Sequence, residues 1–146
     1  MIREFERFHG LALARLLHGA DNEIRIHRFD RESNSGYVVD GRLGLYVKYC
    51  SKRLSPWRFT FNPEHRSEIK RLQHAVGRMF LALVCNDDGV VCLNQIEMQE
   101  VIGDDQEIAW IRAERHLREM YTVSGSTGDL SRKVGVADFP AKLFSI

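Results

Sequence analysis

Apolar residues near the start of the chain recur at the spacing of an α-helix, three or four positions apart with charged residues between them. The stripe consists of Ile2, Phe5, Phe8, Ala12 and Leu16. This spacing predicts an amphipathic helix that ends near Gly19. From Glu23 to Phe29 apolar and polar residues alternate, and this pattern predicts a half-buried strand.

Two β-prone runs follow, Tyr37 to Val39 and Leu43 to Cys50. The Asp40-Gly41 pair between them favours the left-handed torsions of a tight hairpin turn. Side chains alternate along a strand, so Lys48 is expected to leave the apolar face of the second run and to meet solvent. Aromatic and polar residues then alternate from Trp57 to Phe61, which predicts another strand.

A second helix is predicted to begin at Pro63. Asn62 is suited to cap the free amides of the first turn, and proline is well tolerated at the first helical position. The residues expected to face inward are Ile69, Leu72 and Val76. Gly77 is expected to end this helix, because glycine readily adopts the left-handed conformation that terminates many helices.

The most apolar run, Met79 to Cys85, has the pattern of a strand that is buried on both faces. A turn at Asn86 to Gly89 leads into a partner strand, Val90 to Leu93, and these two strands are expected to form the centre of the sheet. Asn94 is expected to cap a short helix. The polar segment from Gly103 to Gln106 is expected to be a break.

The last third of the chain has a less regular pattern. Between Ile108 and Met120 the alanine, glutamate and arginine content favours a helix, while Trp110 also fits an extended chain. We expect a helix there, with a strand as the alternative. Two further runs, Tyr121 to Ser124 and Leu130 to Val136, predict a C-terminal hairpin. The closing tail is expected to pack through Phe139, Leu143 and Phe144.

Together these elements predict a single α+β domain. Its central sheet is mixed or antiparallel, flanked by the N-terminal helix and the mid-chain helix, with the hairpin at the C-terminal end. A chain of 146 residues suits one compact core, and 44% hydrophobic with 28% charged residues is an ordinary globular composition. No run approaches the ~20 apolar residues that span a bilayer, so we expect no membrane contact and a cytoplasmic location.

Cysteine spacing gives little sign of a metal or disulfide framework. Cys50, Cys85 and Cys92 are odd in number and contain no C-x-x-C pair. Such spacing is typical of neither a zinc knuckle nor a set of disulfides. We expect all three to be buried thiols.

Charge is sorted along the chain although the total is near neutral, with 21 basic and 20 acidic residues. The window from Gly41 to Pro63 contains no acidic residue and is rich in cations and aromatic rings. Cations neutralise phosphates and rings stack on bases, so this window predicts contact with DNA or RNA. The expected contact residues are Arg42, Lys52, Arg53, Trp57 and Arg58. Phe59 and Phe61 are expected to belong to the core.

The order of predicted elements from Ile2 to Leu93 resembles the core of the PD-(D/E)XK nuclease-like superfamily. That family places a metal-binding acid on one hairpin arm and an acid-x-lysine pair on the next. Asp40 stands at the position of the first acid and Lys48 at the position of the lysine. Glu6 matches an extra glutamate that some members carry on the first helix. Tyr46 departs from the pattern, because the family has Asp or Glu there.

The resemblance implies Mg²⁺-dependent cleavage of phosphodiester bonds, in which the ion needs oxygen ligands and activates a water molecule. Asp40 and Glu6 would hold the ion, and Lys48 would aid the attacking water. The missing acid would come from the following helix, from Glu68 or Glu64, as in some members. The implied catalytic residues are therefore Asp40, Lys48 and Glu68. Asp40 also fits an ordinary Asp-Gly turn with no further role.

The leading hypothesis is a nucleic-acid-binding protein with a nuclease-like core, either a Mg²⁺-dependent phosphodiesterase or an inactive relative. A noncatalytic protein-interaction module, such as an assembly or inhibitor subunit, is the alternative and needs a protein partner but no metal. A third hypothesis is a small-ligand-binding domain with a pocket lined by Tyr37, Tyr46 and Tyr49.

Overall fold

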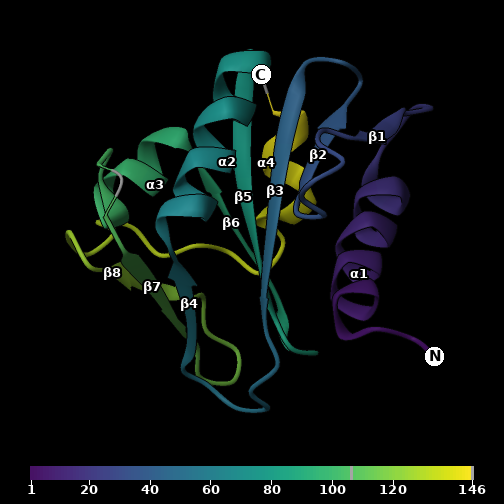
Figure 1. The fold of residues 1–146 in the computed structure, drawn as a ribbon. Helices are drawn as coiled ribbons and strands as arrows, with labels where there is room; N and C mark the ends of the chain where they lie inside the picture. The colour runs from purple at the N-terminus through teal and green to yellow at the C-terminus, as the bar shows by residue number, and fades with distance from the viewer. Residues whose placement is uncertain (106, 146) are drawn as a thin grey trace.

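The computed structural model describes residues 1–105 and 107–145. It contains two β-sheets, which contribute side chains to a common hydrophobic core (Figure 1). Sheet A has the order β1-β2-β3-β5-β6 and sheet B the order β4-β7-β8. The strands are β1 (Ile26–Arg28), β2 (Gly36–Val39), β3 (Leu43–Cys50), β4 (Trp57–Phe61), β5 (Arg78–Cys85), β6 (Gly89–Asn94), β7 (Ala109–Glu114) and β8 (Thr122–Gly125). The helices are α1 (Glu4–Gly19), α2 (Pro63–Ala75), α3 (Gln95–Ile102) and α4 (Asp138–Phe144).

Sheet A is mixed, which confirms the predicted α+β class. β1, β2 and β3 pair antiparallel, and β5 pairs antiparallel with β6. β3 and β5 are parallel, in register from Leu43 opposite Arg78 to Cys50 opposite Cys85. A parallel pair requires a crossover connection, and here β4 and α2 provide it.

Both faces of sheet A are covered. Figure 1 shows α1 on one side of the sheet and α2, α3 and sheet B on the other. On the α1 side Leu16 packs with Leu45 and Phe80, and on the other side Tyr46 and Leu81 share a core with sheet B. The central strands β3 and β5 are therefore buried from both directions, as the sequence predicted for β5.

The predicted helix between Ile108 and Met120 is wrong, because this segment forms β7. Its residues alternate, with Ile111 buried in the core and Arg112 turned toward the outer face. Pairing with β4 and β8 satisfies the backbone of β7, and this tertiary pairing overrides local helix propensity. Gly103 ends α3 as predicted, whereas Gln106 of the expected break lies outside the described residues.

The predicted C-terminal hairpin is present as two isolated bridges rather than a long ladder. Tyr121 pairs with Val134, and Ser124 pairs with Asp129. The other predicted boundaries agree with the structure to within a few residues. In the part of the chain that the structure describes, no helix is long and apolar enough to cross a bilayer.

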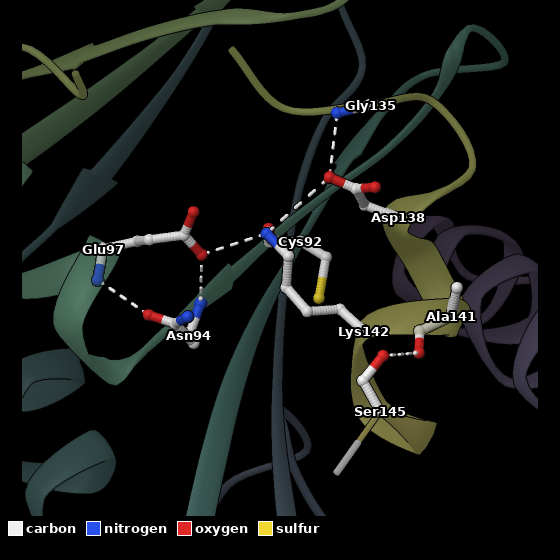
Figure 2. A network of polar contacts seen from close by, with 8 residues as sticks. All are labelled: Cys92, Asn94, Glu97, Gly135, Asp138, Ala141, Lys142 and Ser145. Carbon is white, nitrogen blue, oxygen red and sulfur yellow. Dashed lines mark hydrogen bonds and ion pairs between the residues drawn. The ribbon is translucent and has the colours of Figure 1, made fainter. Parts of the chain in front are cut away.

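A network of polar contacts attaches α4 to the edge of sheet A, as Figure 2 shows. The Lys142 ammonium donates to Glu97 Oε1 at 3.0 Å and to the Cys92 carbonyl at 2.9 Å. Glu97 also accepts from the Asn94 backbone at 2.9 Å, which completes the cap of α3. Phe139 and Leu143 of α4 are buried against the α1 side of sheet A, as expected of the closing tail, whereas Phe144, also expected to pack, is exposed.

We expect Lys142→Ala to lower the free energy of unfolding by about 3 kcal/mol, because the carboxylate of Glu97, of which only 11% is exposed, loses its charge partner. Urea denaturation measures this change. Lys133→Ala is the matched control, since Lys133 is exposed and has no ion pair among residues 1–105 and 107–145; its effect is expected to stay within about 0.5 kcal/mol. Equal effects of the two substitutions would contradict the assigned role of Lys142.

Candidate functional site

Four polar side chains meet near the end of β3 and the start of α2, and we call Tyr46, Lys48, His65 and Glu68 the polar cluster. The Lys48 ammonium lies 3.2 Å from His65 Nδ1 and 5.1 Å from the centre of the Phe61 ring. The Tyr46 hydroxyl donates to Glu68 Oε1 at 2.5 Å. The cluster therefore joins alternate residues of one strand to successive turns of one helix.

The local sequence explains how α2 presents His65. Asn62 Oδ1 accepts a hydrogen bond from the His65 amide at 2.9 Å, and the Asn62 amide donates to His65 Nδ1 at 3.2 Å. This reciprocal cap fixes the imidazole at the first turn of the helix. Because Nδ1 accepts from a backbone amide, the ring proton lies on Nε2, and the Lys48 ammonium donates to the same Nδ1 atom.

Lys48 is half-buried, and the expectation that it faces solvent is wrong. Its side of β3 is covered by α2, so the strand has no exposed face at this point. Burial lowers the pKa of the Lys48 ammonium from 10.5 to about 8, and the charge of Glu68 opposes this shift. Burial likewise lowers the pKa of His65, and the charge of Lys48 lowers it further. At neutral pH the pair is a charged amine beside a neutral imidazole.

Glu68 accepts the hydrogen bond of the buried Tyr46 hydroxyl. Burial raises the pKa of the Tyr46 hydroxyl, and its hydrogen bond to Glu68 raises it further. The phenol therefore remains a donor to this carboxylate over the whole physiological range. Of the three predicted catalytic residues, the structure brings Lys48 and Glu68 together.

Asp40 lies at the opposite end of β3. It has a φ of 54° in the turn between β2 and β3, and Gly41 follows with a φ of 69°. Its carboxylate accepts from the Arg25 amide at 2.9 Å, and its own amide donates to the Arg25 carbonyl at 2.8 Å. Lys48 lies five positions after Leu43, roughly 16 Å along β3. Asp40 thus completes the turn and does not reach the polar cluster.

Glu6 lies on the other side of sheet A from the polar cluster, since α1 covers the face opposite α2. Its carboxylate accepts from the Arg3 amide at 2.9 Å and so caps α1. Asp40 is near the far end of this helix, where it shares a hollow of about 240 Å³ with Ala20. Gly19 lies thirteen positions after Glu6, about 20 Å along the helix.

The carboxylates predicted to hold Mg²⁺ therefore do not converge. Among residues 1–105 and 107–145 there is no group of three or more His, Cys, Asp or Glu side chains arranged to hold a metal ion. Glu68 is the one predicted acid in the polar cluster, and it is engaged by Tyr46 beside the positive charge of Lys48. Mg²⁺ requires several oxygen ligands around one point, so these residues do not fit the ion.

The structure divides the predicted basic residues among three places. Lys52 and Arg53 are exposed in the loop after β3. Arg58 is exposed on the outer face of sheet B, with its guanidinium 4.7 Å from the centre of the Trp110 ring. Arg42 is exposed at the other end of β3, beside the turn that holds Asp40.

Trp57 lies in the core, so the expectation that its ring contacts a base is wrong. It is 2% exposed, and its indole Nε1 donates to the Lys52 carbonyl at 2.8 Å. This bond supports the loop that carries Lys52 and Arg53. Phe59 is buried beside it, as predicted.

Sequence reasoning missed two residues of this region, His65 and Trp110. The cap formed by Asn62 places His65 three positions further along, a position whose side chain can reach back toward the strand end. Trp110 is half-buried on the outer face of sheet B, and only the strand structure of β7 puts it next to Arg58.

Comparison of the chain with protein-family models, with curated proteins and with solved structures gives no match.

We expect Glu68→Gln to lower the pKa of Lys48 below its value of about 8, because the substitution removes the negative charge that favours the ammonium. NMR titration of protein carrying ¹³C-labelled lysine measures this pKa, and loss of the signal in Lys48→Met identifies the resonance. Glu64→Gln is the control, since Glu64 is exposed and has no contact with the Lys48 ammonium. An unchanged or higher pKa in Glu68→Gln would contradict the geometry of the polar cluster.

Proposed function

We propose that this protein binds a nucleic acid, DNA or RNA, by contacting the phosphates of the nucleic acid at the end of β3 and on the loop that follows this strand. The exposed cations Lys52 and Arg53 of the loop form this surface, and the half-buried Lys48 adds positive charge at the end of the strand. Hydrolysis is not part of the proposal, because the carboxylates that would hold Mg²⁺ lie apart.

The observation that carries the proposal is the unneutralised charge of the loop and of the neighbouring strand. Lys52, Arg53 and Arg58 are exposed, and none forms an ion pair with a carboxylate in the described part of the chain. Elsewhere Arg115 and Lys142 are paired with buried or half-buried acids. Exposed cations without carboxylate partners can replace the counterions of a phosphate backbone, which is the main source of affinity for nucleic acids.

The start of α2 adds to this positive potential. The first amides of a helix carry partial positive charge, and anions bind favourably there. Lys48 lies next to this first turn through its contact with His65. A phosphate in front of α2 would meet the helix end and the half-buried ammonium together, and Lys52 and Arg53, in the loop at the other end of β4 (Figure 1), would meet a neighbouring phosphate of the same backbone.

The topology is also consistent with a nuclease-like core without metal-dependent activity. The hairpin of β2 and β3, followed by a crossover through α2 into the parallel strand β5, keeps the order of elements on which the resemblance to the PD-(D/E)XK superfamily rests. Lys48 and Glu68 lie together in this core, whereas Asp40 and Glu6 are remote from them. We infer an inactive relative rather than a Mg²⁺-dependent phosphodiesterase.

A protein partner is the second candidate, and one observation favours it. Leu54 is 65% exposed, Leu117 is 83% exposed, and both line a hollow of about 430 Å³ together with Arg53. Exposed apolar side chains around a concave surface are a feature of protein-binding sites. A noncatalytic interaction module would use these leucines, and the nucleic-acid interface would not need them.

We expect the double variant Lys52→Ala/Arg53→Ala to weaken binding to labelled DNA or RNA and to flatten its salt dependence. Loss of two phosphate contacts should reduce the slope of log K against log salt by about 1.8 for a duplex. Fluorescence anisotropy at several salt concentrations, with Mg²⁺ and with a chelator, measures both effects. Arg42→Ala is the matched control, since Arg42 is exposed at the other end of β3.

Unchanged affinity and slope in the double variant would refute the interface. Weaker binding of a protein partner by Leu54→Ser/Leu117→Ser, with no nucleic acid bound by the wild type, would favour the interaction module instead. Chelator-sensitive cleavage, read on a denaturing gel, would contradict the inference that the core is inactive.

A further inference from the structure

A cleft of about 380 Å³ lies between the start of α1 and the loop that connects β1 to β2. This volume is within the range of small-ligand pockets. The cleft is separate from the polar cluster, because Tyr37 packs on the α1 side of sheet A whereas Tyr46 packs on the α2 side. The wall residues that define its chemistry are Arg3, Phe5, Arg28, Arg31, Glu32 and Tyr37.

Positive charge dominates the walls, with three guanidinium groups against the single carboxylate of Glu32. Arg28 holds the loop in place, since its Nη2 donates to the Arg31 carbonyl at 3.0 Å and to the Asp30 carbonyl at 3.4 Å. Arg3 and Arg31 have no ion pair with any carboxylate of residues 1–105 and 107–145. The Arg3 guanidinium lies over the Phe5 ring, 5.8 Å from its centre, and neither its donors nor those of Arg31 are taken up by a carboxylate in the part of the chain that the structure describes. The fork of donors on each guanidinium matches a phosphate.

Two aromatic rings, Phe5 and Tyr37, form the apolar part of the walls, and His9 fixes both of them. His9 Nδ1 lies 2.8 Å from the Tyr37 hydroxyl, and the Phe5 and His9 rings meet edge to face with centroids 5.4 Å apart. His9 is 4% exposed, and burial lowers its pKa to about 4. The imidazole is therefore neutral at pH 7, and it supports the rings without adding charge to the cleft.

We propose that this cleft binds a nucleoside monophosphate, with the phosphate on Arg3 and Arg31 and the base against Phe5 and Tyr37. A ligand that carries a phosphate beside a flat aromatic group matches both the arginines and the aromatic rings of the cleft. A free nucleotide and the 5′-phosphorylated end of a strand share this chemistry. The inference does not rest on the nucleic-acid interface at the end of β3, because the cleft lies on the other side of sheet A.

The experiment measures binding of AMP, adenosine and inorganic phosphate by calorimetry, together with amide shifts by NMR. We expect AMP to bind at least tenfold more tightly than phosphate or adenosine, with shifts confined to residues 3–9 and 28–37. Arg3→Ala/Arg31→Ala should weaken AMP binding roughly ten- to hundredfold, because charge-assisted hydrogen bonds are lost. Arg15→Ala is the matched control, since Arg15 is exposed on the same helix outside the cleft.

A second variant separates the aromatic wall from the charges. Phe5→Leu should weaken AMP binding several-fold and leave phosphate binding unchanged. Arg31→Glu, at an exposed loop position, tests the charge without changing α1, and it should abolish AMP binding. Thermal melts of each variant show whether it is folded.

Two tetranucleotides, one with a 5′-phosphate and one with a 5′-hydroxyl, distinguish the sources of the ligand. If the phosphorylated strand binds as tightly as AMP, the cleft recognises strand ends; if it binds more weakly, the cleft recognises the free nucleotide. Wild-type AMP affinity in the double arginine variant would overturn the proposal. AMP binding no tighter than that of phosphate, or shifts outside the cleft, would overturn it as well.

Discussion

The parallel pairing of β3 with β5 is the interaction on which the other elements depend. It runs the full length of both strands and requires the chain to leave β3, form β4, and return through α2 before β5 can begin. The crossover lays α2 over one face of the sheet and leaves the other face to α1. Gly44 permits this close approach, since a Cβ atom there would lie 2.9 Å from side-chain carbons of Leu72 and Val76. The same geometry puts the first turn of α2 at the end of β3, next to Lys48.

A second constraint joins sheet B to the end of sheet A. Arg115, just after β7, binds Asp88 in the turn between β5 and β6 through two hydrogen bonds of 2.8 and 2.9 Å. The Tyr121 hydroxyl donates to the same carboxylate at 2.6 Å, and its ring packs edge-on against Trp57. The hydrogen bond from Arg115 lowers the pKa of Asp88. This network holds β4 in place, and with it the loop that presents Lys52 and Arg53.

Local patterns in the sequence were sufficient to predict much of the fold. Apolar periodicity located α1, turn chemistry at Asp40-Gly41 located the hairpin, and the cap at Asn62 located α2. β7 was misjudged because Ala, Glu and Arg have high helix propensity, although Ala109, Ile111 and Ala113 alternate inward. Whether such a segment becomes a helix or a strand depends on the strands with which it can pair, and these cannot be identified from the composition of the segment alone.

The candidate site was predicted only in part, since its geometry depends on tertiary packing. The resemblance implied an acid on the helix after the strand, from Glu68 or Glu64, and the structure brings Glu68 close enough to Lys48 for its charge to act on the ammonium. The burial of Lys48 was missed because a strand pattern does not show what covers its second face. The resemblance also joined Asp40 with Lys48 in one site, but Asp40 lies in the turn before β3 and Lys48 near the end of this strand, so a straight strand holds them apart.

The environment of Lys48 also affects its reactivity as a nucleophile. Only the uncharged form of an amine attacks an electrophile. With a pKa of about 8, about one tenth of Lys48 is uncharged at pH 7, against roughly one part in three thousand for a lysine with the ordinary value of 10.5. A small acylating reagent that can enter between β3 and α2 would therefore react faster with Lys48 than with a lysine of ordinary pKa, and a covalent label there would report directly on access to the polar cluster.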